Sequence, residues 1–156
     1  VFTDGASETE GVTVGAMFFL NGALPEFLAE RVPAGLVEEW RSSGKWQVIG
    51  QAELLPVLLA AVVWADILRN RYVVFWLDQD AARQGLTKGY SPSEHSAVLI
   101  DLASQHLSAL QVFPWFARVP SASNPADAPS RLDLPAVWKS FPGALRRQVP
   151  AEAWVL

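Results

Sequence analysis

The sequence has no cysteine, one methionine and two histidines among its 156 residues. The absence of cysteine excludes disulfide bonds and thiolate metal sites. Basic residues are also few, since 12 Lys and Arg against 16 Asp and Glu give a formal net charge of −4. Domains that only bind nucleic acid are more often basic. The charge therefore counts against a stand-alone nucleic-acid binder, and counts less against an enzyme whose site is itself acidic.

A signal peptide and a membrane-spanning segment are also lacking. The N-terminus has no charged region followed by an apolar one. The longest apolar run, LLPVLLAAVVWA at residues 54–65, is too short to cross a bilayer and predicts a buried helix. We therefore expect an intracellular protein with no membrane partner. Because the chain begins without Met and inside an apparent strand, we also expect it to be part of a longer polypeptide.

Apolar and aromatic residues are what the sequence has in abundance. Hydrophobic residues make up 51% and charged residues 18%, which is typical of one globular domain with a real core. The seven Trp residues fit a core better than a base-stacking surface. Trp40 and Trp46 are the two that we consider for substrate contact.

Local patterns predict a mixed sheet with helices on its faces. The expected strands are residues 1–4, 12–20, 26–32, 46–49, 72–77 and 112–119, with turns at 5–8 and 21–22. The expected helices are residues 33–44, 51–70, 79–87 and 91–110, with one or two helical turns at 124–131.

Four of these expectations rest on single features. The continuous apolar run YVVFWL at 72–77 suits a central strand covered on both faces. Pro114 favours an edge position for the last strand. Pro56 is tolerated in a helix that starts near Glu53, because its missing N–H then lies in the first turn. Ser91-Pro92-Ser93-Glu94 reads as a capping box that opens the next helix.

Four acidic residues stand at special places in this pattern. Asp4 and Asp78 each end an apolar strand, Glu53 opens the buried helix, and Asp127 lies on the short final element. Carboxylates that share one spot repel each other unless cations neutralise them. Oxygen ligands of this kind suit Mg²⁺, and a pair of such ions supports phosphodiester cleavage. The four acids therefore predict a metal-dependent nuclease site.

The motifs around these acids resemble those of the ribonuclease H family. They read FTDGA, QAELLPVLLA, VVFWLDQDAA and SNPADAPSR in chain order. The last contains the most specific piece, N-x-A-D-x-x-S-R at residues 124–131. The pattern is most similar to the ribonuclease H domain that follows the reverse transcriptase in retrotransposon polyproteins. It covers residues 1–131, within which residues 24–44 look like an insertion.

This resemblance implies an α/β fold with a mixed five-stranded sheet and helices on both faces. It implies that Asp4, Glu53, Asp78 and Asp127 hold two Mg²⁺ ions, for which Mn²⁺ may substitute, and that these acids are the catalytic residues. The implied activity is cleavage of the RNA strand of RNA:DNA hybrids during reverse transcription, beside a linked reverse transcriptase domain. Candidates for substrate contact are Asn124, Ser91 and Gln79. Contacts to 2′-hydroxyls would select the RNA strand.

The sequence departs from the family pattern at several points. Gln79 replaces the usual Asn after the third acid, residues 120–123 contain no His, and a basic helix that grips the hybrid is not evident. A catalytically weak or inactive module that positions nucleic acid for a linked reverse transcriptase therefore remains an alternative. A related nuclease that acts on DNA is a third.

Each acid also has an ordinary structural interpretation. Asp4 before a glycine suits a turn, Glu53 suits a helix N-terminus, and residues 78–80 could cap the following helix. Lys45, Arg83 and Lys88 could contact phosphate, with solvated surface as their default. For His95 and His106 we expect surface or packing roles. Residues 132–156 are rich in proline and predict an irregular tail or linker, which Trp138, Phe141 and Trp154 could pack against the domain.

Overall fold

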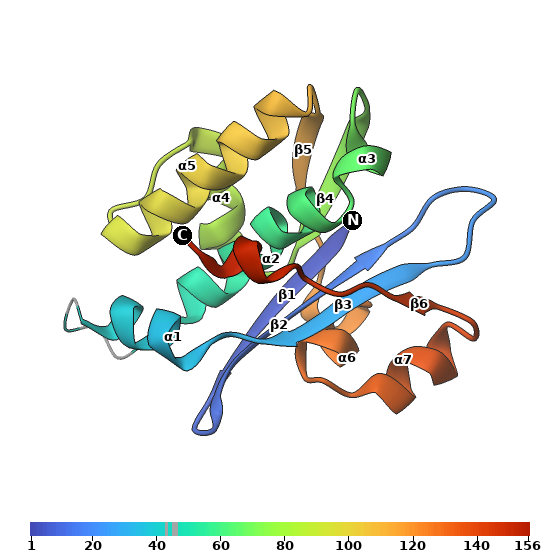
Figure 1. Ribbon diagram of the computed structural model, residues 1–156, viewed down its shortest axis with the longest axis horizontal. Helices are drawn as coiled ribbons and strands as arrows, with labels where there is room; N and C mark the ends of the chain where they lie inside the picture. Colours follow the sequence, from blue (N-terminus) through green and yellow to red (C-terminus); the bar gives the residue numbers. More distant parts are fainter. Residues whose placement is uncertain (43, 45–46) are drawn as a thin grey trace.

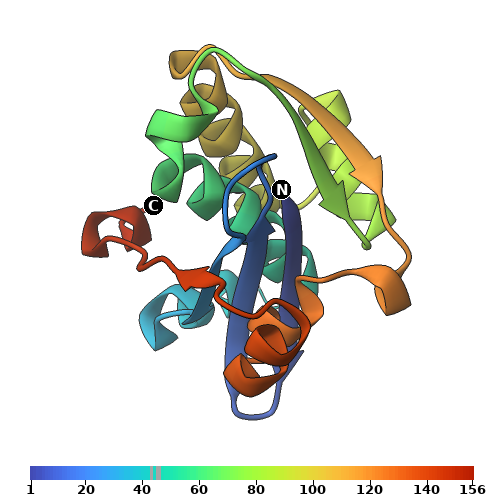
Figure 2. The same cartoon turned by 90° about the vertical axis from the view of Figure 1, so that its right-hand side faces the viewer.

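The computed structural model describes residues 1–42, 44 and 47–156. Within them lies a six-stranded mixed sheet in the order β5-β4-β1-β2-β3-β6, with helices on both faces (Figures 1 and 2). The predicted α/β class and the helices on both faces are confirmed, and the sheet has one strand more than the expected five. Lys45 and Trp46 lie outside the described residues.

One half of the sheet is an antiparallel meander of β1 (Phe2–Glu8), β2 (Gly11–Phe18) and β3 (Glu26–Arg31). The turn predicted at residues 5–8 is wrong. Those residues continue β1, because Gly5 pairs with Val14 and the ladder runs on to Glu8 opposite Gly11. Asp4 therefore lies inside a strand and not at its end.

The other half consists of β4 (Tyr72–Leu77) and β5 (Phe113–Arg118), which run parallel to β1. β5 is an edge strand, as Pro114 predicts. β4 is central but is buried on one face only: Phe75 is fully buried, whereas the Tyr72 side lies open, with Tyr72 87% exposed. The expectation that β4 is covered on both faces is wrong, because the helices of the second face pack on the meander.

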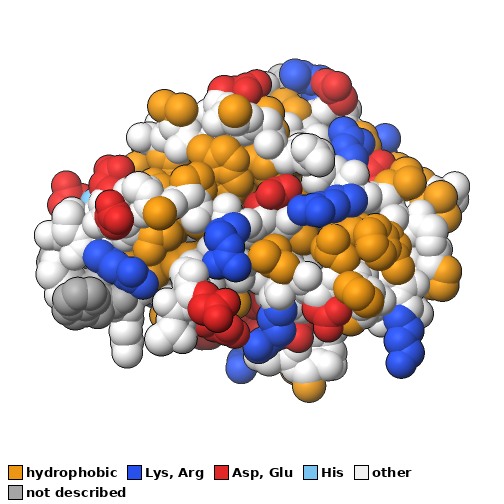
Figure 3. All heavy atoms as spheres, turned by 60° about the horizontal axis from the view of Figure 1, so that its bottom comes forward, with side chains coloured by type: hydrophobic (Ala, Val, Ile, Leu, Met, Phe, Trp, Pro, Cys, Tyr) orange, Lys and Arg blue, Asp and Glu red, His pale blue; other side chains and the backbone are white. Residues whose placement is uncertain are grey.

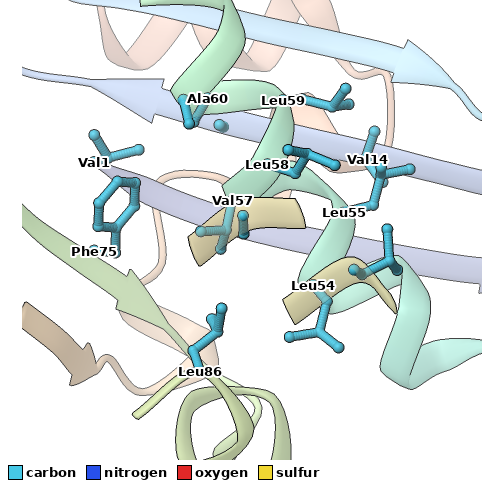
Figure 4. Close-up of a cluster of buried hydrophobic side chains, with 14 of the residues drawn as sticks. Val1, Val14, Leu54, Leu55, Val57, Leu58, Leu59, Ala60, Phe75 and Leu86 are labelled. Atoms are coloured by element: carbon cyan, nitrogen blue, oxygen red, sulfur yellow. The ribbon is translucent and has the colours of Figure 1, made fainter. Parts of the chain in front are cut away.

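The larger core lies between the sheet and α2 (Ile49–Val63), which is buried on nearly all sides as predicted. Leu54, Leu55, Val57 and Leu58 of this helix lie among Val14, Phe75 and Leu86 (Figure 4). Also on this side are α1 (Ala34–Arg41), α3 (Ala65–Leu68), α4 (Asp80–Lys88) and α5 (Glu94–Ala109).

Two helix starts differ from the predictions by more than one residue, and the single helix predicted at 51–70 is divided into α2 and α3. α2 begins at Ile49, so the predicted strand at 46–49 is wrong in its described part, and Glu53 lies inside the helix and not at its N-terminus. α5 begins at Glu94, later than the capping box suggests, because the Ser91 hydroxyl accepts a hydrogen bond from the Ser93 N–H (3.2 Å) ahead of the helix.

The second face of the sheet carries η1 (Ser121–Ser123), α6 (Asp127–Ser130) and α7 (Leu134–Ser140). α7 packs Val137 against Met17 and Phe27 in a smaller core. The chain then forms β6 (Leu145–Arg146), which pairs with β3, and η2 (Ala151–Trp154).

The prediction of an irregular segment after residue 131 is therefore wrong. That prediction rested on the prolines of the segment. Pro135, however, occupies the first turn of α7, where a missing N–H costs nothing. Asp133 caps the same helix by accepting the Ala136 N–H (3.1 Å). Likewise β3 lies within the stretch 24–44 that looked like an insertion, although it pairs with β2 along its whole length.

The surface does not present a single sign of charge on the face drawn in Figure 3. Among the described residues there, lysine and arginine side chains are spread between acidic and hydrophobic ones. Two ion pairs of the described structure join Arg146 to Glu30 and Arg147 to Glu26. Within the described part of the chain, no helix combines the length and apolarity needed to cross a membrane.

Candidate metal centre

The register between β1 and β4 brings Asp4 and Asp78 together. Phe2 lies opposite Trp76 in the parallel ladder, and their rings stack with centroids 5.7 Å apart. Side chains in a strand alternate between faces with a period of two. Asp4 and Asp78, each two residues further along, therefore lie on the same face and next to each other.

Glu53 reaches this place from α2 because the helix comes unusually close to β1. A Cβ atom at Gly5 would lie 2.1 Å from the Ala52 carbonyl oxygen, so only glycine permits this approach. That carbonyl has lost its usual helical partner, since Pro56 has no N–H to donate to it. The proline in α2 and the glycine in β1 therefore both affect one group, the Ala52 carbonyl, which immediately precedes Glu53.

The three carboxylates form one compact group. One ligand oxygen from each of Asp4, Glu53 and Asp78 lies within 4.8 Å of the others. Asp4 and Glu53 are buried, at 6% and 4% exposure, and Asp78 is half-buried. Glu53 Oε2 is buried and has no hydrogen-bond partner among the described residues.

Burial and mutual repulsion raise the pKa values of Asp4 and Glu53. Burial, aided by the charges of Asp4 and Asp78, raises the pKa of Glu53 to about 9. Burial also raises the pKa of Asp4 to about 6, against the lowering effect of a hydrogen bond from Ser130, and the charges of Asp78 and Asp127 add to the rise. Perturbed acids in one cluster are typical of functional sites.

Asp127 lies outside this group of three. Its side chain is 51% exposed and accepts a hydrogen bond from Arg131 Nε at 2.9 Å. Arg131 also lies 3.6 Å from Glu8. The charge of Asp127 still contributes to the raised pKa of Asp4, so it stands beside the group without joining it.

The three predicted substrate contacts have partners within the protein. Gln79 is the N-cap of α4 and accepts the Ala82 N–H at 2.6 Å. Asn124 is buried and donates to the Thr3 carbonyl at 3.0 Å. Ser91 accepts the Ser93 N–H. Their proposed contact with substrate stays a prediction.

Arg83 and Lys88, considered for phosphate contact, have partners within the protein, and Trp40, considered for substrate contact, is buried. Arg83 pairs with Asp80 at 2.8 Å, and Lys88 lies 3.5 Å from Gln84 Oε1. Trp40 is only 3% exposed, so burial contradicts its role in substrate contact. Sequence reasoning also gave no role to Ser130, whose hydroxyl bonds to Asp4, although Ser130 belongs to the motif at 124–131.

Comparison with known proteins gives a match at the level of structure. No family model matches the sequence, and no curated protein does. Among solved structures, the chain is similar to ribonuclease H1 from the halophilic archaeon Halobacterium salinarum NRC-1, with a TM-score of 0.63 and 18% identity over 86% of this chain and 96% of that one. The fold is that of ribonuclease H.

Within this ribonuclease H fold, the acidic group fits a divalent cation. Three carboxylates this close are unfavourable unless protonated or neutralised. The unpartnered Glu53 Oε2 supplies a buried oxygen that nothing in the described protein satisfies. Hard cations such as Mg²⁺ and Mn²⁺ prefer such oxygen ligands. Asp4, Glu53 and Asp78 are the residues that could hold one.

Proposed function

We propose that this chain is a metal-dependent endoribonuclease that cleaves the RNA strand of RNA:DNA hybrids, acting beside a linked reverse transcriptase of a retroelement inside the cell. The observation that carries the proposal is the group of three carboxylates with an unsatisfied Glu53 oxygen. The ribonuclease H fold and the order of the four acidic motifs support the choice of substrate. The motif at residues 124–131 supports the retroelement context.

Asp4, Glu53 and Asp78 would hold Mg²⁺ or Mn²⁺, and Asp127 would complete a second site at the rim. Bound ions of this kind polarise a phosphodiester and lower the pKa of water. The protein contributes a buried pair of acids, Asp4 and Glu53, and a more exposed pair, Asp78 and Asp127. The buried pair would shield a bound cation from bulk water, and the exposed pair would leave one side open to a nucleic-acid strand.

The test compares two aspartates that lie two residues apart. Asp78→Asn should abolish cleavage of a labelled RNA:DNA duplex in Mg²⁺, because it removes one of the three clustered charges. Asp80→Asn is the matched control, since Asp80 binds Arg83 and Gln84 at the start of α4 and is not in the group. Equal activity of Asp78→Asn and wild type would refute the proposal. Parallel assays on duplex DNA and single strands separate hybrid cleavage from a DNA nuclease.

The ion pair between Asp127 and Arg131 favours one alternative, a weakly active or inactive module that positions nucleic acid. An acid held by arginine is less available to a second cation. Titration with Mg²⁺ and Mn²⁺ distinguishes the two functions, because an inactive module of this kind would show no cation-dependent rise in thermal stability.

A further inference from the structure

The segment from Asn124 to Ser130 is fastened to β1 at two consecutive residues, Thr3 and Asp4. The Asn124 amide donates to the carbonyl of Thr3 at 3.0 Å, and its oxygen accepts the Ala126 N–H at 3.1 Å. The Ser130 hydroxyl donates to Asp4 Oδ2. Asn124 is 6% exposed and Ser130 is completely buried, so neither bond competes with solvent.

The geometry points to Ser130 as a positioning residue for Asp4: its hydroxyl holds Asp4 Oδ2, fixes the rotation of the carboxylate, and so orients Asp4 toward Glu53 and Asp78. This inference rests on the proposed function. The terminal torsion of an aspartate is broad and has no strong preference of its own. A directed bond to one oxygen removes that freedom, and groups that orient ligands in this way tune metal affinity.

Two acceptor oxygens lie within reach of the Ser130 hydroxyl. Ser130 Oγ lies 2.9 Å from the Asp127 carbonyl oxygen, one turn earlier in α6. A hydroxyl has a single proton to donate, and the closer acceptor is the Asp4 carboxylate, a charged group when ionised.

Gly15 explains why α6 sits close enough for this short side chain to reach. Gly15 pairs directly with Asp4 in the β1–β2 ladder. A Cβ atom there would lie 2.2 Å from the Ser130 nitrogen and 2.6 Å from the Pro129 carbonyl carbon. The α6 backbone therefore rests on the glycine beside Asp4, and the serine hydroxyl spans the remaining distance.

The motif N-x-A-D-x-x-S-R thus divides into two pairs. Asn124 and Ser130 are buried and bond to consecutive residues of β1. Asp127 and Arg131 are exposed and bond to each other. The buried pair acts on the geometry of Asp4, which a sequence-based assignment of Asn124 to substrate contact does not anticipate.

The experiment measures cation affinity without relying on cleavage. Wild type, Ser130→Ala and Ser96→Ala are melted over a Mn²⁺ titration, and the half-saturating concentration is read from the rise in Tm. Ser96 is the matched control, because it is a buried serine in α5 and is outside the acidic group. We expect Ser130→Ala to raise the half-saturating concentration about 10- to 100-fold, and Ser96→Ala to leave it unchanged.

A purely structural role would lower the Tm of the metal-free protein without moving the half-saturating concentration, and that result would overturn the inference. In an Asp4→Asn background, Ser130→Ala should have no further effect on cation affinity. If Ser130→Ala does not fold, Ser130→Cys decides by the same ratio, since it keeps the size and only a weak donor. A wild-type protein that shows no response to Mn²⁺ would overturn both this inference and the proposed function, whereas an unchanged Ser130→Ala overturns this inference alone.

Discussion

Glu53 should make the metal-free protein less stable as the pH rises. Its pKa is about 9 in the folded protein against an ordinary value of 4.5. The folded state therefore keeps a proton that the unfolded chain loses, so stability is highest below pH 4.5 and declines as the pH rises toward 9. One such group contributes a slope of at most about 1.4 kcal/mol per pH unit.

The raised pKa of Asp4 also makes stability fall as the pH rises, but over a narrower pH range. Its folded pKa of about 6 lies above the ordinary 3.8, so its share of the decline is complete soon after pH 6. Between pH 6.5 and 8.5, Glu53 alone of these two acids continues to titrate. Over that range we expect the Glu53 contribution to the free energy of unfolding to fall by about 1 kcal/mol per pH unit, and its total cost at pH 8 to approach about 5 kcal/mol. Burial lowers the pKa of the Val1 amine from 8.0 to about 6, which acts in the opposite direction, so the Glu53 contribution is read as a difference between variants.

Glu53→Gln should remove this decline. Glutamine has nearly the same shape, does not titrate, and can donate an amide N–H to a neighbouring carboxylate. In EDTA, urea unfolding followed by tryptophan fluorescence should give a profile without the Glu53 decline, so that the slopes of variant and wild type differ by about 1 kcal/mol per pH unit between pH 6.5 and 8.5. The variant should be more stable than wild type at pH 8 and similar to it at pH 4.5. Added Mn²⁺ should reverse the order at pH 8, because only wild type keeps the third carboxylate.

The control for Glu53→Gln is a glutamate that lies on the surface. Glu39→Gln changes an exposed glutamate of α1 and should keep the wild-type slope. Parallel pH profiles for wild type and Glu53→Gln would show that Glu53 ionises in the folded state as it does in water. The argument from burial and repulsion would then be wrong.

Two further predictions concern packing. Gly5→Ala should lower the free energy of unfolding by about 1–3 kcal/mol and weaken cation binding, since its Cβ would lie 2.1 Å from the Ala52 oxygen and force α2 and Glu53 away. Its control is Gly35→Ala, whose Cβ would meet nothing within 4 Å. This control should be neutral or slightly stabilising in the same urea assay. Phe75→Ala should cost about 3–5 kcal/mol because Phe75 is fully buried, whereas Trp115→Ala on the 71% exposed edge should cost about 1 kcal/mol or less; equal losses would contradict the assigned core.

The sequence predicted those features that local chemistry decides. Apolar runs, strand-forming residues and turn residues located β1 to β5 near their true positions, although β1 runs on to Glu8, and Pro114 identified the edge strand. The α/β class followed from the order of the predicted strands and helices. The acids were singled out by their predicted places at element ends, although Asp4 and Glu53 lie inside their elements. The proline-rich end was misjudged, because a proline in the first turn of a helix and a proline in a loop look alike without knowledge of what Val137 packs against.

The arrangement of the site depended on contacts between distant segments. Asp4 and Asp78 are neighbours because Phe2 lies opposite Trp76, and no local pattern fixes that register. The prediction placed Glu53 at a helix start so that Pro56 would fall in the first turn. The helix instead starts at Ile49, and the carbonyl that Pro56 leaves unpaired is the one that meets Gly5.

Two glycines in adjacent strands set the depth of the site. Gly5 admits α2 on one face of the sheet and Gly15 admits α6 on the other, each at a distance that a Cβ atom would forbid. Together they bury Glu53 and Ser130 on either side of Asp4. The close packing that raises the pKa values of the acids and lowers the stability of the metal-free protein is therefore the same packing that brings three carboxylates within reach of one cation. A variant that relaxes either contact should reduce the repulsion between the acids and so gain stability from them in the metal-free state. The same variant should lose affinity for metal.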